Sequence, residues 1–117
     1  MGTSGKRDGE SLQVTSLAAP DGGVVLQLAG ELDLSTVTIF VEALDDLLES
    51  ETTRIELDMS ELSFIDSSGV GAYVTAYRKA EAKGSALRVG ERSALVNRVL
   101  QLSGVEEALA EEAADKT

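Results

Sequence analysis

The 117-residue sequence contains no cysteine and no histidine. Disulfide frameworks, thiolate zinc sites, cysteine nucleophiles and serine–histidine triads are therefore excluded. Aromatic side chains are scarce too, with two Phe, two Tyr and no Trp, so we expect no platform for stacking nucleic-acid bases. These absences remove most hydrolytic chemistry and most single-strand nucleic-acid binding.

Basic residues are a minority, because ten Lys and Arg stand against 21 Asp and Glu, for a net charge of −11. This charge repels phosphate backbones and anionic membrane surfaces, so a protein or a basic small molecule is the expected partner. Seven acids and no base lie between Glu31 and Glu51. That stretch either presents a negative face to a basic partner or simply keeps the protein soluble.

Long apolar runs are also missing, since none approaches the roughly 20 residues that span a bilayer. Residues 1–10 are polar and glycine-rich without the apolar core of a secretory signal, which predicts a disordered leader and a cytoplasmic protein. At about 150 residues per domain the chain forms one domain. Its core must consist of Leu, Val, Ile and Ala.

Alternating apolar residues predict strands. Two such segments, over 12–14 and 24–28, flank the turn-forming cluster Pro20–Gly23 and predict a hairpin. A third strand covers 54–59, from which Leu62, Phe64 and Ile65 are expected to continue into the core. A fourth covers 86–89.

Apolar residues three and four apart predict helices between these strands. The first covers 37–48, with Ser35 or Thr36 as its cap. The second begins near Ser67 and ends at Gly84, and the third runs from Ser93 to Gly104. A short acidic helix over 105–114 follows. The order predicts an α/β fold, a mixed sheet of about four strands with helices packed on it, whose strand-to-helix junctions carry function.

The junction Phe64–Gly71 is the most informative stretch, because small polar residues join an apolar strand end to a helix. It fits a helix start in which Asp66, Ser67 or Ser68 caps the free amides. Its two glycines indicate a phosphate loop only weakly, and a nucleophile elbow is close to excluded without histidine. A further hypothesis is a helix-start serine phosphorylated by another enzyme, since the amides there accommodate a dianion.

Three blocks, Gly30–Asp33, Phe64–Gly71 and Ser93–Val105, together resemble the anti-sigma-factor antagonists (anti-anti-sigma factors) of the STAS domain family. The resemblance covers about residues 11–110, taken as the domain, and leaves 111–117 as an acidic tail. It implies a STAS-like sheet. The acidic run after Val105 departs from the family, in which many members have a last strand, so the C-terminal element stays open.

The resemblance implies partner switching. The unphosphorylated antagonist binds an anti-sigma factor that is also a serine kinase, and so frees a sigma factor. That kinase, with its own ATP, phosphorylates the first Ser after the Asp, here Ser67, and a serine phosphatase reverses the step. The protein itself then has no catalytic activity, cofactor or metal, and neither nucleic acid nor membrane is a direct partner.

The resemblance also implies roles for the neighbours of Ser67. Asp66 shapes the site, Ser68 is a second cap hydroxyl, Gly69 and Gly71 let a partner approach, and Asp33 contacts a basic group of that partner. The expected partner-binding residues are Asp33, Asp66, Ser68, Gly69, Val70 and Gly71.

Three alternatives remain open. The domain is a scaffold or sensor-complex STAS module whose Ser67 is modified without release of a sigma factor. Alternatively it is a small nucleotide- or phosphate-binding domain that uses the amides of Gly69–Ala72. The third, a phosphoacceptor carboxylate at Asp58 as in receiver domains, ranks low because the accompanying acidic pair and lysine are missing from the expected strand ends.

Overall fold

The computed structural model describes residues 4–8 and 11–115. They form one sheet of five strands in the order β1-β2-β3-β4-β5, in which β1, β2 and β3 pair antiparallel and β3, β4 and β5 pair parallel. The strands are β1 (Ser4–Asp8), β2 (Leu12–Ala18), β3 (Val24–Leu32), β4 (Arg54–Ile65) and β5 (Ala86–Arg92). The predicted mixed α/β sheet is confirmed.

Strand β1 corrects one expectation. Residues 1–10 are predicted as a disordered leader, but Ser4–Asp8 pair with β2 and add a fifth strand. Their sequence, SGKRD, lacks the apolar alternation by which a strand is recognised. The rest of that leader lies outside the described residues.

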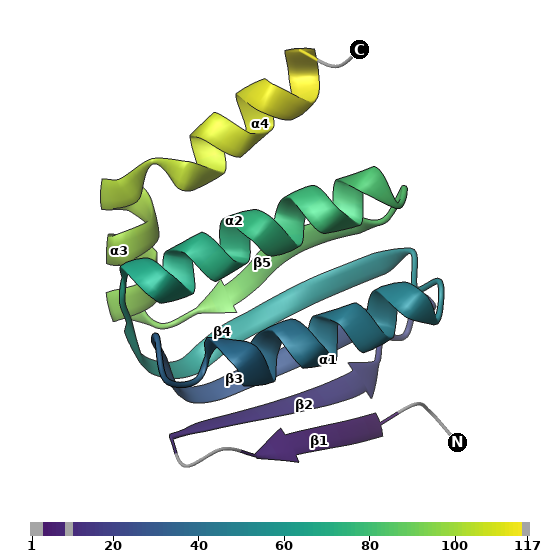
Figure 1. Ribbon diagram of the computed structural model, residues 1–117, viewed down its shortest axis with the longest axis horizontal. Helices are drawn as coiled ribbons and strands as arrows, with labels where there is room; N and C mark the ends of the chain where they lie inside the picture. Colours follow the sequence, from purple (N-terminus) through teal and green to yellow (C-terminus); the bar gives the residue numbers. More distant parts are fainter. Residues whose placement is uncertain (1–3, 9–10, 116–117) are drawn as a thin grey trace.

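Four helices complete the fold: α1 (Val37–Glu49), α2 (Ser67–Ala82), α3 (Ala94–Ser103) and α4 (Val105–Asp115). Figure 1 shows α1 and α2 side by side across the sheet, with α3 after β5 and α4 leading away from it. The chain passes from α3 directly to α4 through Gly104, and the described residues form no strand between them. Among these residues no helix is both long and apolar enough to cross a bilayer.

The core lies between the sheet and α1 and α2. Leu28 and Leu57 from the central strands, Phe40 from α1 and Ala80 from α2 are completely buried. The alternate residues of the strands point away from the helices and are half-buried, such as Val25 and Glu56, or exposed, such as Gln27. The core is mostly aliphatic, as expected from the composition, but it also contains Phe40, Met59 and Tyr73.

The predicted turn and helix ends are observed. Gly22 and Gly84 have φ of +96° and +76°, in a region that glycine adopts far more readily than other residues. Helix α3 begins at Ser93, whose Oγ accepts the Val96 N–H at 3.2 Å, and ends at Gly104 with φ +66°. Thr36, one of the two predicted caps, occupies the N-cap position of α1, although its side chain forms no hydrogen bond with the first amides of the helix.

Strand β4 contains two irregularities in its pairing with β3, and they determine on which face of the sheet its last side chains lie. Its register with β3 shifts after Asp58 and again between Leu62 and Phe64, and each shift adds one residue on β4. Asp58 Oδ1 accepts both the N–H (2.9 Å) and the hydroxyl (2.7 Å) of Ser60 at the first shift. Asp58 is therefore part of a bulge inside the strand rather than a residue at its end.

The second shift explains a wrong prediction. Leu62 and Ile65 are buried as expected, but Phe64 is 44% exposed instead of lying in the core. Strict alternation places Leu62 and Phe64 on one face, and an inserted residue reverses the face of everything after it. Phe64 is thereby turned outward at the end of β4.

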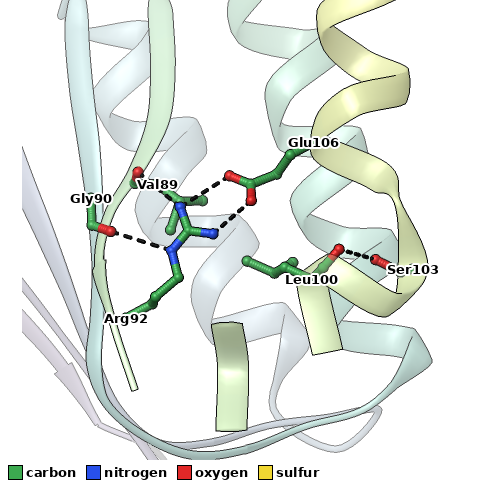
Figure 2. A network of polar contacts seen from close by, with 6 residues as sticks. All are labelled: Val89, Gly90, Arg92, Leu100, Ser103 and Glu106. Carbon is green, nitrogen blue, oxygen red and sulfur yellow. Dashed lines mark hydrogen bonds and ion pairs between the residues drawn. The ribbon is translucent and has the colours of Figure 1, made fainter. Parts of the chain in front are cut away.

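Helix α4 is tied to the sheet by a partly buried ion pair, shown in Figure 2. The Arg92 guanidinium donates to Glu106 at 2.6 and 3.1 Å, and its Nε and second amino group also contact the carbonyls of Gly90 and Val89. The hydrogen bond with Glu106 raises the pKa of Arg92. Burial, and secondarily the Glu106 charge, raises the pKa of Tyr73 to about 12.

Candidate functional site

The parallel strands β3 and β4 end side by side, and the loops that follow them form one edge of the molecule. Leu32 pairs with Ile65 at the last register position, and the Asp66 N–H donates to the Leu32 carbonyl at 3.3 Å. We call residues 33–36 and 66–71 the carboxyl edge. Ligands of open sheets with parallel strands bind at such edges, because side chains from several loops meet there.

Asp66 is the residue that caps α2. Its backbone is extended, and its Oδ1 accepts the Gly69 N–H at 3.0 Å while its carbonyl accepts the Val70 N–H at 3.0 Å. A carboxylate at this position satisfies a free amide and complements the positive end of the helix dipole. Asp66 thereby fixes the start of α2, directly before Ser67.

Because Asp66 caps α2, neither Ser67 nor Ser68 is needed as the capping residue. The Ser67 side chain is exposed and that of Ser68 is half-buried. Among the described residues, neither hydroxyl takes part in a hydrogen bond that would hold it in place. Ser67 is therefore an accessible nucleophilic oxygen at the first position of a helix.

The two glycines of the segment face different surroundings. Gly69 is buried, and a Cβ placed there would lie 2.5 Å from the Leu32 carbonyl oxygen and 2.8 Å from the Ile65 side chain. Its lack of a side chain thus serves the packing of α2 against β3 within the chain itself. A partner cannot approach Gly69 directly, which corrects the role expected for it.

Gly71 is exposed, and a Cβ there would meet nothing within 4 Å. Side chains on a helix lean toward its N-terminus, so a side chain at 71 would lie over Ser67, one turn earlier. Gly71 therefore leaves the helix surface next to Ser67 free of a side chain. Val70 is half-buried and packs against the core.

Asp33 holds the β3–α1 loop in shape. Its Oδ1 accepts the N–H (3.0 Å) and the hydroxyl (2.7 Å) of Ser35. Thr36 is buried, and its hydroxyl donates to the Glu31 carbonyl at 2.8 Å and accepts the Asp33 N–H at 3.0 Å. The side-chain hydrogen bond from Ser35 is the main cause that lowers the pKa of Asp33. The carboxylate is thus ionised and partly engaged inside its own loop.

Sequence reasoning missed two apolar side chains at this edge. Leu34 is 76% exposed in the β3–α1 loop, and Phe64 is exposed at the end of β4. The exposure of Leu34 could have been recognised, because this residue fits neither the strand alternation nor the helix spacing. The exposure of Phe64 could not, because it depends on the irregular pairing of β4 with β3. Solvent-exposed large apolar residues beside a polar site are typical of binding surfaces.

The carboxyl edge is also anionic. Asp33 and Asp66 lie in its two loops, and Glu31 is exposed just before them. The sequence has no Lys or Arg from residue 8 to 53 or from 55 to 77, so these two loops and their flanks contain no base. Among the described residues no group of three or more His, Cys, Asp or Glu is arranged to hold a metal ion.

A family model described as "Mlab, STAS domain" matches residues 8–111. The chain belongs to the STAS domain family.

Relatives of known name agree with this assignment. The chain is 31% identical over 85 residues to an anti-sigma F factor antagonist of Paenibacillus polymyxa, a match that covers 72% of this chain and 73% of that protein. It is 30% identical over 78 residues to an anti-sigma-B factor antagonist of Listeria monocytogenes, covering 67% and 68% of the two chains.

Two solved structures resemble the chain over nearly the whole of their own length. The unphosphorylated form of the anti-sigma factor antagonist SpoIIAA matches with a TM-score of 0.65 at 28% identity, covering 86% of this chain and 96% of that one. The phosphorylated form of SpoIIAA from Bacillus matches with a TM-score of 0.60 at 30% identity, covering 91% and 98%. The STAS fold expected from the sequence is confirmed.

Proposed function

We propose that this STAS domain is an anti-sigma-factor antagonist that binds an anti-sigma factor while Ser67 is unmodified and releases it when Ser67 is phosphorylated. The names of its relatives support the general role. The single observation that carries the switch is the exposed, unbonded Ser67 hydroxyl on a helix that Asp66 already caps.

The chemical step belongs to the partner. Ser67 Oγ attacks the γ-phosphorus of ATP, the bond from that phosphorus to the bridging oxygen breaks, and ADP leaves. The hydroxyl proton passes to a base of the serine kinase. A serine phosphatase reverses the modification by hydrolysis of the phosphoester. The STAS domain contributes an accessible hydroxyl and no catalytic group, so we propose a non-enzymatic role for it.

Electrostatic repulsion explains how phosphorylation of Ser67 would release the partner. A phosphate adds about −1.5 to −2 charges at Ser67, next to Asp66 and in loops without a base. With no cation in those loops to neutralise it, the dianion stays available to oppose binding. Docking a partner would then have to desolvate this charge beside carboxylates. A coupling of about 3 kcal/mol, roughly a hundredfold in affinity, suffices to exchange partners.

The surface around Ser67 defines the chemistry of the partner. Leu34 and Phe64 are exposed apolar side chains that a partner can cover, and the outer oxygen of Asp33 remains free for a basic group. An apolar centre with a charged rim is the usual composition of a protein interface. We therefore assign the binding surface to the carboxyl edge, with Phe64 added to the residues expected from the sequence.

The test is to mix the protein with candidate anti-sigma kinases and ATP and to map phosphate by peptide mass spectrometry. Modification of Ser67, lost in Ser67→Ala and retained in the matched neighbour variant Ser68→Ala, is the expected result. Phosphate on another residue, or equal binding of the kinase by Ser67→Ala and Ser67→Asp, would overturn the switch. A partner that is no anti-sigma factor would favour the scaffold alternative.

A further inference from the structure

The outward face of α3 is apolar and basic. Leu95 and Leu102, two turns apart on one face of the helix, are 42% and 81% exposed. Arg98 lies between them, is exposed, and is the single charged residue of α3. In a protein of net charge −11, this helix surface without an acid is unusual, and exposed leucines of this kind indicate contact with another surface.

The outward face of α4 has the opposite charge. All five of its charged residues are acidic. Glu106 and Glu112 point back to the chain and pair with Arg92 (2.6 Å) and Arg78 (3.2 Å), as Figure 2 shows for the first pair. Glu107 and Glu111 are one turn apart on the exposed side, and within the described part of the chain neither forms an ion pair.

Alanine surrounds these two acids. Ala108 and Ala110 are exposed beside them, whereas the large apolar residue of α4, Leu109, is buried on the inward side. Small residues on a helix let another helix approach closely, so that large side chains from it can pack between them. The outward face of α4 is thus complementary to that of α3 in both shape and charge.

The two faces cannot meet within one molecule. α3 and α4 are joined directly through Gly104, and each buries its other side, with Val96 and Leu100 on α3 and Leu109 on α4. Both outward faces therefore remain available to a second molecule. Because each copy has both faces next to each other, a two-fold axis lets α3 of each copy meet α4 of the other.

We propose that the chain forms a symmetric dimer in which α3 of one copy packs on α4 of its partner, and the reverse. Leu95 and Leu102 cover the alanines, and Arg98 pairs with Glu107 and Glu111 of the second copy. This interface uses none of the carboxyl edge residues, so it is independent of the proposed switch and can fail or succeed separately from it.

The test is sedimentation equilibrium of the full chain from about 1 µM to about 1 mM. We expect a concentration-dependent rise toward twice the monomer mass. Leu102→Glu should abolish the rise, while Leu34→Glu, a leucine of matched exposure (76% against 81%) at the carboxyl edge, should keep it. A wild-type chain that stays monomeric throughout overturns the proposal.

Charge exchange tests the specific pairing. Arg98→Glu should weaken self-association by at least about tenfold, because it faces like charges at both contacts, and Glu107→Lys/Glu111→Lys should do the same. An equimolar mixture of the two variants should associate again, since in the mixed dimer both contacts join opposite charges. Association of either variant alone as strongly as wild type, or failure of the mixture to associate, would overturn the α3-to-α4 arrangement.

Discussion

The acidic side chains at the two ends of the parallel strands have different partners. At the amino end of β4, Arg54 donates to the Asp21 carbonyl and pairs with its carboxylate at 3.4 Å. At the carboxyl end, Asp33 and Asp66 accept hydrogen bonds from N–H and O–H groups, and no base lies in either loop. One end neutralises its acid internally, and the other keeps its acids beside exposed apolar residues.

The comparison separates stability from function. A surface ion pair such as that of Arg54 adds little free energy, but it leaves no unbalanced charge for a partner. The carboxyl edge leaves both negative charge and apolar surface uncovered, which a protein built only for stability would avoid. Substitutions at the carboxyl edge should therefore change binding more than folding.

The largest effect is expected for Ser67→Asp. A carboxylate at the first turn of α2, which has no acid there, should leave stability equal or slightly raised by the helix dipole, while binding of the anti-sigma factor falls by up to about a hundredfold. Calorimetric titration and urea unfolding of the same sample measure the two quantities. Arg54→Ala at the amino end is the control, and comparable loss of binding there would contradict the contrast.

The two glycines should respond in opposite directions. Gly69→Ala forces a Cβ to within 2.5 Å of the Leu32 carbonyl and should destabilise the fold by about 1–3 kcal/mol. Gly71→Ala meets no neighbour and should stabilise α2 by about 0.5–1 kcal/mol, yet slow the phosphorylation of Ser67. Urea midpoints and kinase assays report both, and a Gly71→Ala protein phosphorylated at the wild-type rate would remove its role in access.

Phe64→Ala should weaken partner binding by about tenfold, since aromatic residues near the centre of an interface contribute most. Folding should change much less than for a fully buried aromatic, because nearly half of the side chain is already exposed. Leu102→Ala, which removes an exposed apolar side chain of α3 outside the carboxyl edge residues, is the control for binding. Equal losses for the two variants would show that exposure alone, rather than position, decides the effect.

The smallest effect concerns Asp33. Its pKa is lowered in the fold from 3.8, so its contribution to stability is present above the unfolded pKa and disappears as the pH falls through the lowered folded pKa. Asp33→Asn should therefore be less stable than wild type at pH 7 and equally stable near pH 2. Denaturation at both pH values measures this, and a difference that persists at low pH would point to a cause other than ionisation.

Much of the fold was predictable from residue spacing. The hairpin, the central strands and all four helices follow alternation or three-and-four spacing, and Ser93, Gly84 and Gly104 mark helix ends. Strand β1 was missed because its polar sequence carries no alternation. The position of Phe64 was missed because two inserted residues in β4 depend on how it pairs with β3.

The candidate site, like the fold, was predictable from the sequence only in part. The segment Asp66–Gly71 identified a helix start with available hydroxyls, and the family resemblance pointed to Ser67 within it. The sequence alone determined every element except β1, the lack of bases in the two loops of the site, and the family, because these depend on local spacing and residue identity. Tertiary structure decided that Asp66 is the cap, that Gly69 is buried against β3 whereas Gly71 is exposed, and that Leu34 and Phe64 face solvent. Those outcomes depend on which atoms of distant strands and loops come within van der Waals distance, and spacing along the chain does not contain that information.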